Sequence, residues 1–171
     1  GKVLRVQVET FSANTITILL ENTESSREKR KFLKLTFITG SIYLVLGLLS
    51  GVFGSIFGHI FMLFLTLIPV YLHFNVFESE TVTFVRHFAL QNTTKYSSGR
   101  VENRLIPTHS IHDIVINEVI QRQRVIFMLQ ILLEQEIKKK ERIFSLFEKS
   151  KPNLQCLEFI YNLLHKRWEK S

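Results

Sequence analysis

The stretch that decides the fold is Leu35–Phe77, which reads LTFITGSIYLVLGLLSGVFGSIFGHIFMLFLTLIPVYLHFNVF and contains no Asp, Glu, Lys or Arg. As one straight helix, its 43 residues would extend for about 65 Å, whereas the hydrocarbon core of a bilayer is about 30 Å thick. Two antiparallel helices fit that thickness, and glycines near the middle of the run would let the chain reverse. The stretch therefore predicts a two-helix transmembrane hairpin, and a hairpin that dips into the bilayer without crossing it is the alternative.

The charges that flank this run predict its orientation. Residues Arg27–Lys34 read REKRKFLK, and by the positive-inside rule this end faces the cytosol. A phosphoinositide site is the other interpretation of the basic segment. Because a hairpin returns Glu78 to the same side, we expect both termini to be cytosolic. The predicted domains are the N-terminal strands and basic segment at 1–34, the transmembrane hairpin at 35–77 and a cytosolic domain at 78–171.

Small residues within the run are spaced so that they could form a helix surface. Gly47, Gly51, Gly54 and Gly58 follow a 4, 3, 4 spacing, which would align them on one helix face. Such a face lets another helix approach closely, so Gly47 and Gly51 are candidate partner contacts. Glycines that serve only the turn and internal packing are the alternative.

Two short β-rich segments precede the membrane run. Val3–Thr10 and Thr15–Leu20 alternate apolar and polar residues, and Ser12–Asn14 between them supplies turn-forming side chains. They predict a β-hairpin. Because two strands alone are marginally stable in water, we expect them to need strands from the C-terminal domain.

The C-terminal segment has an α+β pattern. Thr81–Thr94, Arg100–Ile106 and Ile111–Ile116 are β-rich, and the first two are separated by a turn at Lys95–Gly99. From Asn117 to about Glu134 nearly every position is apolar, which we interpret as a long helix. Strands followed by helices predict a small α+β domain.

A final amphipathic helix is expected after this segment. Ser150 is the candidate N-cap, and Pro152 lies in the first turn. Apolar residues then recur at helical spacing: Leu154, Leu157, Ile160, Tyr161, Leu164 and Trp168. One face of this helix should therefore pack against the domain.

Composition narrows the functional classes. The net charge of +7 fits lysines beside an anionic membrane, and no basic-aromatic stripe favours nucleic acid as a partner. The single cysteine, Cys156, cannot form an internal disulfide. No phosphate-binding loop, nucleophile elbow or zinc-protease motif is present, so we expect no catalytic residue and no cofactor.

Two local clusters could carry chemistry. His109 and His112, with Asp113 adjacent, have the residue types of a metal site but no clear further ligand, so we expect no metal. Glu118, within IVINEV, is a carboxylate among apolar residues and could be a buried acid. A structural hydrogen-bonding role is favoured for it.

Several motifs of the C-terminal segment occur together in a characteristic order. They are Tyr96–Arg100 (YSSGR), Ile106-Pro107, Asp113–Ile120 (DIVINEVI) and Ser150–Leu157 (SKPNLQCL). Over roughly residues 78–165 the chain resembles the PIG-H family, which are components of phosphatidylinositol N-acetylglucosaminyltransferase. It departs from the family pattern at Ala89, where glycine is usual, and at Asn153, where arginine often follows the proline.

The resemblance implies a non-catalytic subunit in the first step of glycosylphosphatidylinositol (GPI) anchor synthesis. In that step a complex at the cytosolic face of the endoplasmic reticulum transfers N-acetylglucosamine from UDP-N-acetylglucosamine to phosphatidylinositol. The implied partners are the catalytic glycosyltransferase subunit, other membrane subunits and the lipid bilayer. A pleckstrin-homology-like fold is implied by analogy.

The leading hypothesis is that this subunit docks and positions the catalytic subunit at the membrane. The candidate contacts, besides the two glycines, are Asn117, Glu118, Leu154, Leu157 and Tyr161. One rival is a phosphoinositide-binding module that uses Lys95, Arg100 and Arg104. Others are a hairpin that shapes the endoplasmic reticulum, and an enzyme in its own right.

Overall fold

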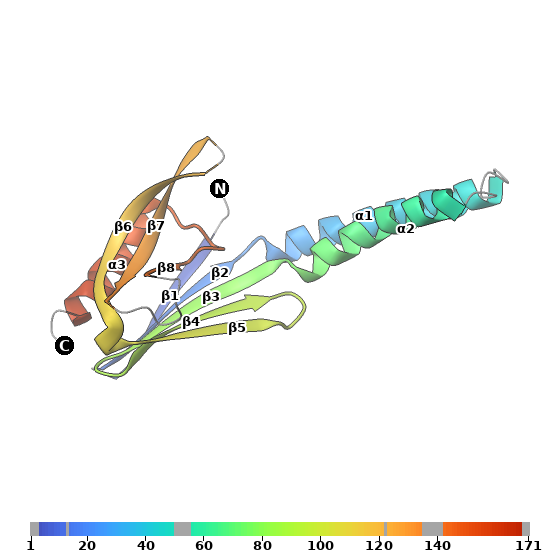
Figure 1. Cartoon of the computed structure of the whole chain (residues 1–171). Helices are drawn as coiled ribbons and strands as arrows, with labels where there is room; N and C mark the ends of the chain where they lie inside the picture. Colours follow the sequence, from blue (N-terminus) through green and yellow to red (C-terminus); the bar gives the residue numbers. More distant parts are fainter. Residues whose placement is uncertain (1–3, 13, 50–55, 122, 135–141, 169–171) are drawn as a thin grey trace. The chain divides into compact units, whose positions relative to one another are not determined.

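Strands from both sides of the long apolar stretch meet in one antiparallel sheet. The structure, a computed structural model, describes residues 4–12, 14–49, 56–121, 123–134 and 142–168. The five-stranded sheet has the order β1-β2-β3-β4-β5 (Figure 1). Its strands are β1 (Leu4–Ser12), β2 (Thr15–Asn22), β3 (Phe77–Val85), β4 (Ala89–Tyr96) and β5 (Val101–Pro107).

The pairing of β2 with β3 joins the N-terminal hairpin to the rest of this sheet. The two strands are antiparallel from the pair Thr15↔Val85 to the pair Glu21↔Ser79. The predicted N-terminal hairpin and its pairing with C-terminal strands are therefore confirmed. The predicted strand at 81–94 is instead two strands, separated by a turn in which His87 has a positive φ of 59°.

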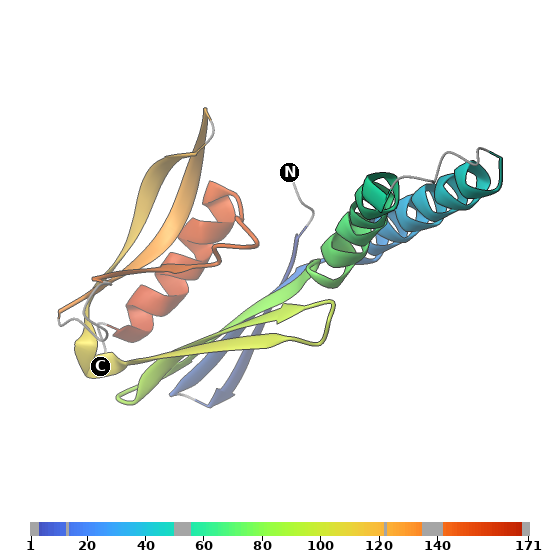
Figure 2. The ribbon, with the colours of Figure 1, turned by 45° about the vertical axis from the view of Figure 1, so that its right-hand side comes forward.

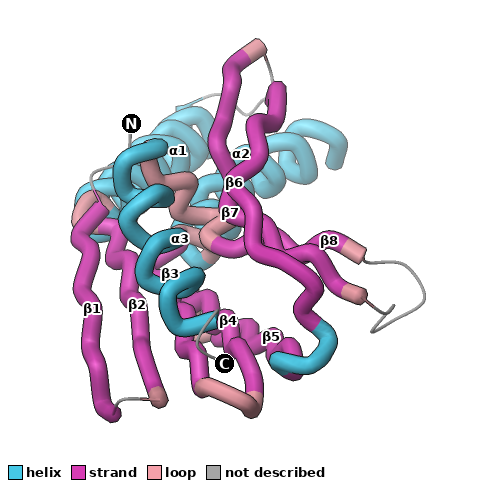
Figure 3. Tube along the Cα trace, turned by 90° about the vertical axis from the view of Figure 1, so that its left-hand side faces the viewer, coloured by secondary structure: helices cyan, strands magenta, loops and turns pink. Residues whose placement is uncertain are grey.

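A second sheet contains three strands in the order β6-β7-β8. They are β6 (Ile111–Gln121), β7 (Arg124–Leu133) and β8 (Ile143–Leu146), and Figure 3 shows β6 and β7 running side by side. The prediction of a helix from Asn117 to about Glu134 is wrong. An apolar run does not distinguish a helix from paired strands by periodicity, and here β-branched residues flank a polar bend in which Gln123 has a φ of 63°.

The C-terminal helix α3 (Leu154–Trp168) lies along one face of the second sheet (Figure 2). The predicted apolar stripe is confirmed, because Leu157, Ile160 and Leu164 are buried in a core that both sheets share. The predicted N-cap at Ser150 is wrong. Asn153 is the cap, since its Oδ1 accepts a hydrogen bond of 3.0 Å from the backbone N–H of Cys156.

Two compact units divide the chain. One contains Gly1–Thr23, Glu78–Lys95 and Val101–Ser171, and the other contains Glu24–Phe77 together with Tyr96–Arg100. In the second unit, α1 (Ser25–Leu49) and α2 (Ile56–Phe74) lie side by side and antiparallel. The hydroxyl of Tyr43 lies 3.1 Å from Nδ1 of His59, which links the two helices.

The prediction of a membrane protein with a two-helix transmembrane hairpin is wrong. Among the described residues, one helical segment, Phe57–Phe74 in α2, is long and apolar enough to cross a membrane. Helix α1 begins at Ser25 and carries the basic segment in its first turns, so its described part is not an uninterrupted apolar span. With one candidate span, the multi-pass topology has no support.

Two further expectations on the fold are also corrected. The first unit holds two sheets and, in its described part, one C-terminal helix, rather than one small sheet followed by several helices. Gly47 lies in α1 and Gly58 in α2, so these two do not share one helix face. Gly51 and Gly54 lie outside the described residues.

Candidate functional site

One face of the five-stranded sheet changes from apolar to polar along its strands. On β3, Val82 and Phe84 are buried in the core, and two residues further toward the start of the same strand Glu80 is buried as well. Neighbouring strands change in the same direction, and the buried polar residues of this region are Asn22, Glu80, Asn92 and Thr94. Burying polar groups costs free energy unless they find partners, so this end of the face is a candidate site.

Glu80 is the central residue of this polar region. It is 1% exposed, and its Oε2 accepts hydrogen bonds from the backbone N–H of Ser150 at 2.9 Å and from the Ser150 hydroxyl at 2.6 Å. Its Oε1 accepts one from the backbone N–H of Lys149 at 3.3 Å and a longer one from the Thr94 hydroxyl at 3.5 Å. The carboxylate thus ties β3 to the chain segment that leads into α3.

A cavity of about 70 Å³ opens beside this carboxylate. Buried Glu80, Asn92 and Thr94 form its floor, and exposed Arg104 and Lys149 contribute to its rim. The register explains why residues of two strands meet here, because Asn92 pairs with Arg104, and Thr94 pairs with Glu102. Residues two apart on paired strands share one face of the sheet.

The sequence placed the buried acid at the wrong residue. Glu118 on β6 is exposed, so the hypothesis of a buried acid there is wrong. The buried acid is Glu80, which the sequence analysis missed. Its signal was the alternation of Glu80, Val82 and Phe84 at a period of two on a β-rich segment.

The other predicted contacts differ in how accessible they are. Asn117 is exposed on β6, and its Nδ2 donates a hydrogen bond of 3.2 Å to Oε1 of Gln130 on β7. On α3, Leu154 and Tyr161 are half-buried, whereas Leu157 is 0% exposed and belongs to the core. Gly47 is exposed on α1.

Cys156 is a half-buried residue on α3, as expected for a helix-face position. Burial raises the pKa of its thiol. The thiolate is the reactive form of cysteine, so this environment disfavours reactivity.

The remaining sequence clusters do not come together as sites. No group of three metal-ligating side chains occurs in the part of the chain that the structure describes, which includes His109, His112 and Asp113. Lys95 and Arg104 lie on opposite faces of the sheet, because Arg104 is opposite Asn92, three residues from Lys95. The three cations of the phosphoinositide hypothesis therefore do not converge.

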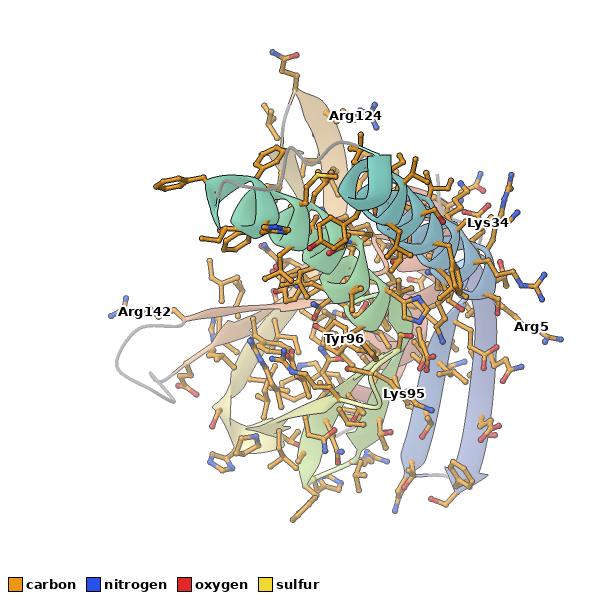
Figure 4. All side chains as sticks on the ribbon, turned by 90° about the vertical axis from the view of Figure 1, so that its right-hand side faces the viewer. Arg5, Lys34, Lys95, Tyr96, Arg124 and Arg142 are labelled. Atoms are coloured by element: carbon orange, nitrogen blue, oxygen red, sulfur yellow. The ribbon has the colours of Figure 1, made fainter. Side chains whose placement is uncertain are left out.

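The turn Tyr96–Arg100 belongs to the same compact unit as the two long helices. The backbone N–H of Ser98 donates to the carbonyl of Phe74, the last residue of α2, at 3.1 Å, which satisfies a free helix-end carbonyl. Gly99 has a φ of 79°, and the Arg100 guanidinium lies 5.6 Å from the centre of the Tyr96 ring. Figure 4 labels Tyr96 beside Lys95, which forms an ion pair of 3.9 Å with Glu78.

Comparison with known proteins agrees with the motifs in the C-terminal segment. Residues 81–148, from β3 to just past β8, match the family model described as the PIG-H component of the GPI-GlcNAc transferase complex. Over 103 residues, which are 58% of this chain and 55% of each relative, the chain is 36% identical to the H-type subunit of phosphatidylinositol N-acetylglucosaminyltransferase from Mus musculus and 35% identical to that from Homo sapiens. It thus matches about half the length of these relatives. No solved structure matches the chain.

Proposed function

Because residues 81–148 carry the PIG-H domain, we propose that this chain is an accessory subunit of the complex that transfers N-acetylglucosamine to phosphatidylinositol, the first step of GPI anchor synthesis. The single observation that carries the proposal is this match, which spans six strands and includes most of the polar cavity. The role of Glu80 supports a non-catalytic assignment, because its two oxygens are engaged in holding the segment before α3.

We infer that α2 attaches this subunit to a membrane at the endoplasmic reticulum. Only 6% of the candidate window Phe57–Phe74 is buried, and such a large exposed apolar surface is unusual in water. Figure 4 shows many carbon side chains around the two helices. Large apolar side chains that α2 exposes are Phe57, Phe61, Phe64, Ile68, Tyr71 and Phe74.

The sheet restricts how the chain can enter this membrane. The residue before α1 and the residue after α2 lead to β2 and β3, which are paired neighbours in one sheet. The chain therefore enters and leaves the helical segment on one side of the bilayer. Basic residues in the first turns of α1, Arg27, Lys29, Arg30 and Lys31, would then lie near anionic headgroups.

The proposed docking surface for the catalytic subunit is the exposed part of β6 near its hairpin end. β6 is an edge strand of the three-stranded sheet, and an edge strand can pair with a strand of another chain. Asn117 and Glu118 are exposed there, and Ile120 is 79% exposed. Leu154, Tyr161 and Gly47 remain proposed secondary contacts, whereas the core position of Leu157 assigns it to packing.

The experiment that tests the proposal is co-purification from cells that lack the endogenous subunit. The double variant Glu118→Arg, Ile120→Asp should reduce recovery of the catalytic subunit and the cell-surface level of GPI-anchored proteins. Leu105→Asp is the matched control, because Leu105 is also an exposed apolar residue but lies on β5. If the double variant and the control restore both quantities equally, β6 is not the docking surface; if the unmodified chain restores neither, the subunit assignment is wrong.

A flotation assay tests the membrane role separately. The full chain should float with phosphatidylcholine and phosphatidylserine vesicles, and Phe61→Asp combined with Phe64→Asp should abolish flotation while Leu105→Asp does not. Retained flotation of the double variant would contradict attachment through α2. The rival hypothesis of a membrane-shaping hairpin lacks support, because it requires two spans and the described residues provide one candidate.

A further inference from the structure

The cavity beside Glu80 contains a buried acceptor that the described part of the protein leaves unused. Asn92 is 7% exposed, and its Oδ1 accepts no hydrogen bond from any described residue. Buried polar atoms in native structures are nearly always paired with protein groups, water or a ligand. An N–H or O–H donor inside the cavity would satisfy this oxygen.

The volume of the cavity exceeds what one water molecule needs. A cavity needs about 10–15 Å³ of this kind of volume to hold a single water. The cavity measures about 70 Å³, so several hydrogen-bonding groups fit within it. Glu80 and Thr94 beside Asn92 supply two further oxygen atoms at the floor, where the Thr94 hydroxyl donates to Glu80.

The rim carries both signs of charge. Glu102 and Glu148 line it together with Arg104 and Lys149. A small anion would face the carboxylates of Glu80, Glu102 and Glu148, and a small cation would face the two basic side chains. A mixed lining of this kind matches neither class of simple ion.

A hydroxyl group matches both kinds of lining atom, because it donates one hydrogen bond and accepts others. It can donate to Asn92 Oδ1 and to the rim carboxylates, and it can accept from Arg104 and Lys149. The Arg104 guanidinium lies 5.6 Å from the centre of the Phe144 ring, which lines the same cavity, so this donor is held above it by a cation–π contact.

We propose that this cavity binds a small polyhydroxylated ligand, a sugar or a cyclitol, and that Asn92 Oδ1 accepts a hydrogen bond from one of its hydroxyls. The proposal rests on the cavity and its unpaired acceptor, and it does not depend on the subunit role proposed above. Occupancy would link β4, β5 and the segment before α3, since these line the cavity.

The test is saturation-transfer NMR on the full chain, held in a detergent without a sugar headgroup. The probes are myo-inositol, N-acetylglucosamine and glucose, with inorganic phosphate and ethylammonium as the anion and cation arms. We expect a saturable signal from at least one polyol. Asn92→Ala should weaken its binding about tenfold, the loss of one good hydrogen bond of about 1.4 kcal/mol.

Two other variants complete the design. Gln91→Ala is the matched control, because residue 91 is the neighbour of Asn92 on β4 and lies on the other face of the sheet. Arg104→Gln should also weaken binding several-fold, and since Arg104 is exposed, this variant retains the fold even if the change at Asn92 does not.

Three results would overturn the proposal. They are the absence of saturable binding for every polyol, which would mean that the cavity holds water; polyol binding that neither Asn92→Ala nor Arg104→Gln weakens; and binding of phosphate or ethylammonium in preference to all three polyols. Polyol binding that these two variants weaken and Gln91→Ala does not is the supporting result.

Discussion

Replacing Glu80 with glutamine should loosen the attachment of the segment before α3. Oε2 of Glu80 accepts two hydrogen bonds from Ser150, and Oε1 accepts one from the backbone N–H of Lys149. Glutamine keeps one acceptor oxygen and presents an NH2 group where the other stood. At least one N–H of the protein then faces a donor instead of an acceptor.

The magnitude follows from the type and burial of these bonds. Hydrogen bonds to a charged group contribute about 1.5–3 kcal/mol each, and a buried donor without an acceptor costs about 1–3 kcal/mol. Thr94 can accept from the new NH2 group, and the Ser150 hydroxyl already donates to the carbonyl of Phe147 at 3.3 Å, which limits the loss. We therefore expect Glu80→Gln to lower the free energy of unfolding by about 2–4 kcal/mol.

Urea unfolding of the full chain in mild detergent, followed by tryptophan fluorescence, measures this change. Trp168 is the single tryptophan of the sequence and lies at the end of α3, so its emission reports on the affected unit. Glu78→Gln is the matched control, because Glu78 is two residues away on β3 and forms a partly exposed ion pair with Lys95. Such pairs contribute about 0–1 kcal/mol. Amide hydrogen exchange at Lys149 and Ser150 should accelerate with Glu80→Gln; equal losses of stability in the two variants, or unchanged exchange, would refute the reasoning.

Four further changes have expected outcomes that stability and reactivity measurements can check. Leu157→Ala should lower the free energy of unfolding by about 2–5 kcal/mol because the side chain is fully buried, whereas Phe159→Ala, on the exposed face of α3, should cost less than about 1 kcal/mol; a similar cost for both would contradict the helix orientation. Asn153→Ala should cost about 1 kcal/mol through loss of the N-cap, while Asn162→Ala in the exposed interior of α3 should be neutral or stabilising. Gly99→Ala should be destabilising by about 1 kcal/mol because of its φ of 79°, and Gly40→Ala, which meets no atom within 4 Å, should stabilise α1 by about 0.5–1 kcal/mol; the opposite signs would refute the turn geometry. Because burial raises the pKa of Cys156, its alkylation at pH 8 should be slower in the folded chain than in urea, and equal rates would contradict the burial.

Local patterns in the sequence determined several features of the fold. The alternation in residues 3–20 predicted the N-terminal hairpin, and the turn at Lys95–Gly99 and the buried stripe of the last helix were predicted as well. The family resemblance was also available from four short motifs in the C-terminal segment, and the comparison with known proteins confirms it. All of these signals depend on residues that are close together in the chain.

The tertiary structure decided what local patterns leave open. Residues 117–134 are apolar enough for a buried helix or for paired strands, and their pairing as β6 with β7 and of β7 with β8 settles the choice. The apolar length of Leu35–Phe77 gave no information on where α1 begins, and its start at Ser25 places charged residues in the same helix.

The candidate site depends most strongly on contacts between distant residues. Glu80 meets Ser150 across seventy positions of sequence, and Asn92 meets Arg104 through the register of β4 with β5. The sequence by itself determined that strands, an apolar helix and an amphipathic helix form, because their periodicity is local. Only the tertiary structure decided which polar side chains are buried together, because burial depends on which face of each strand the rest of the chain covers.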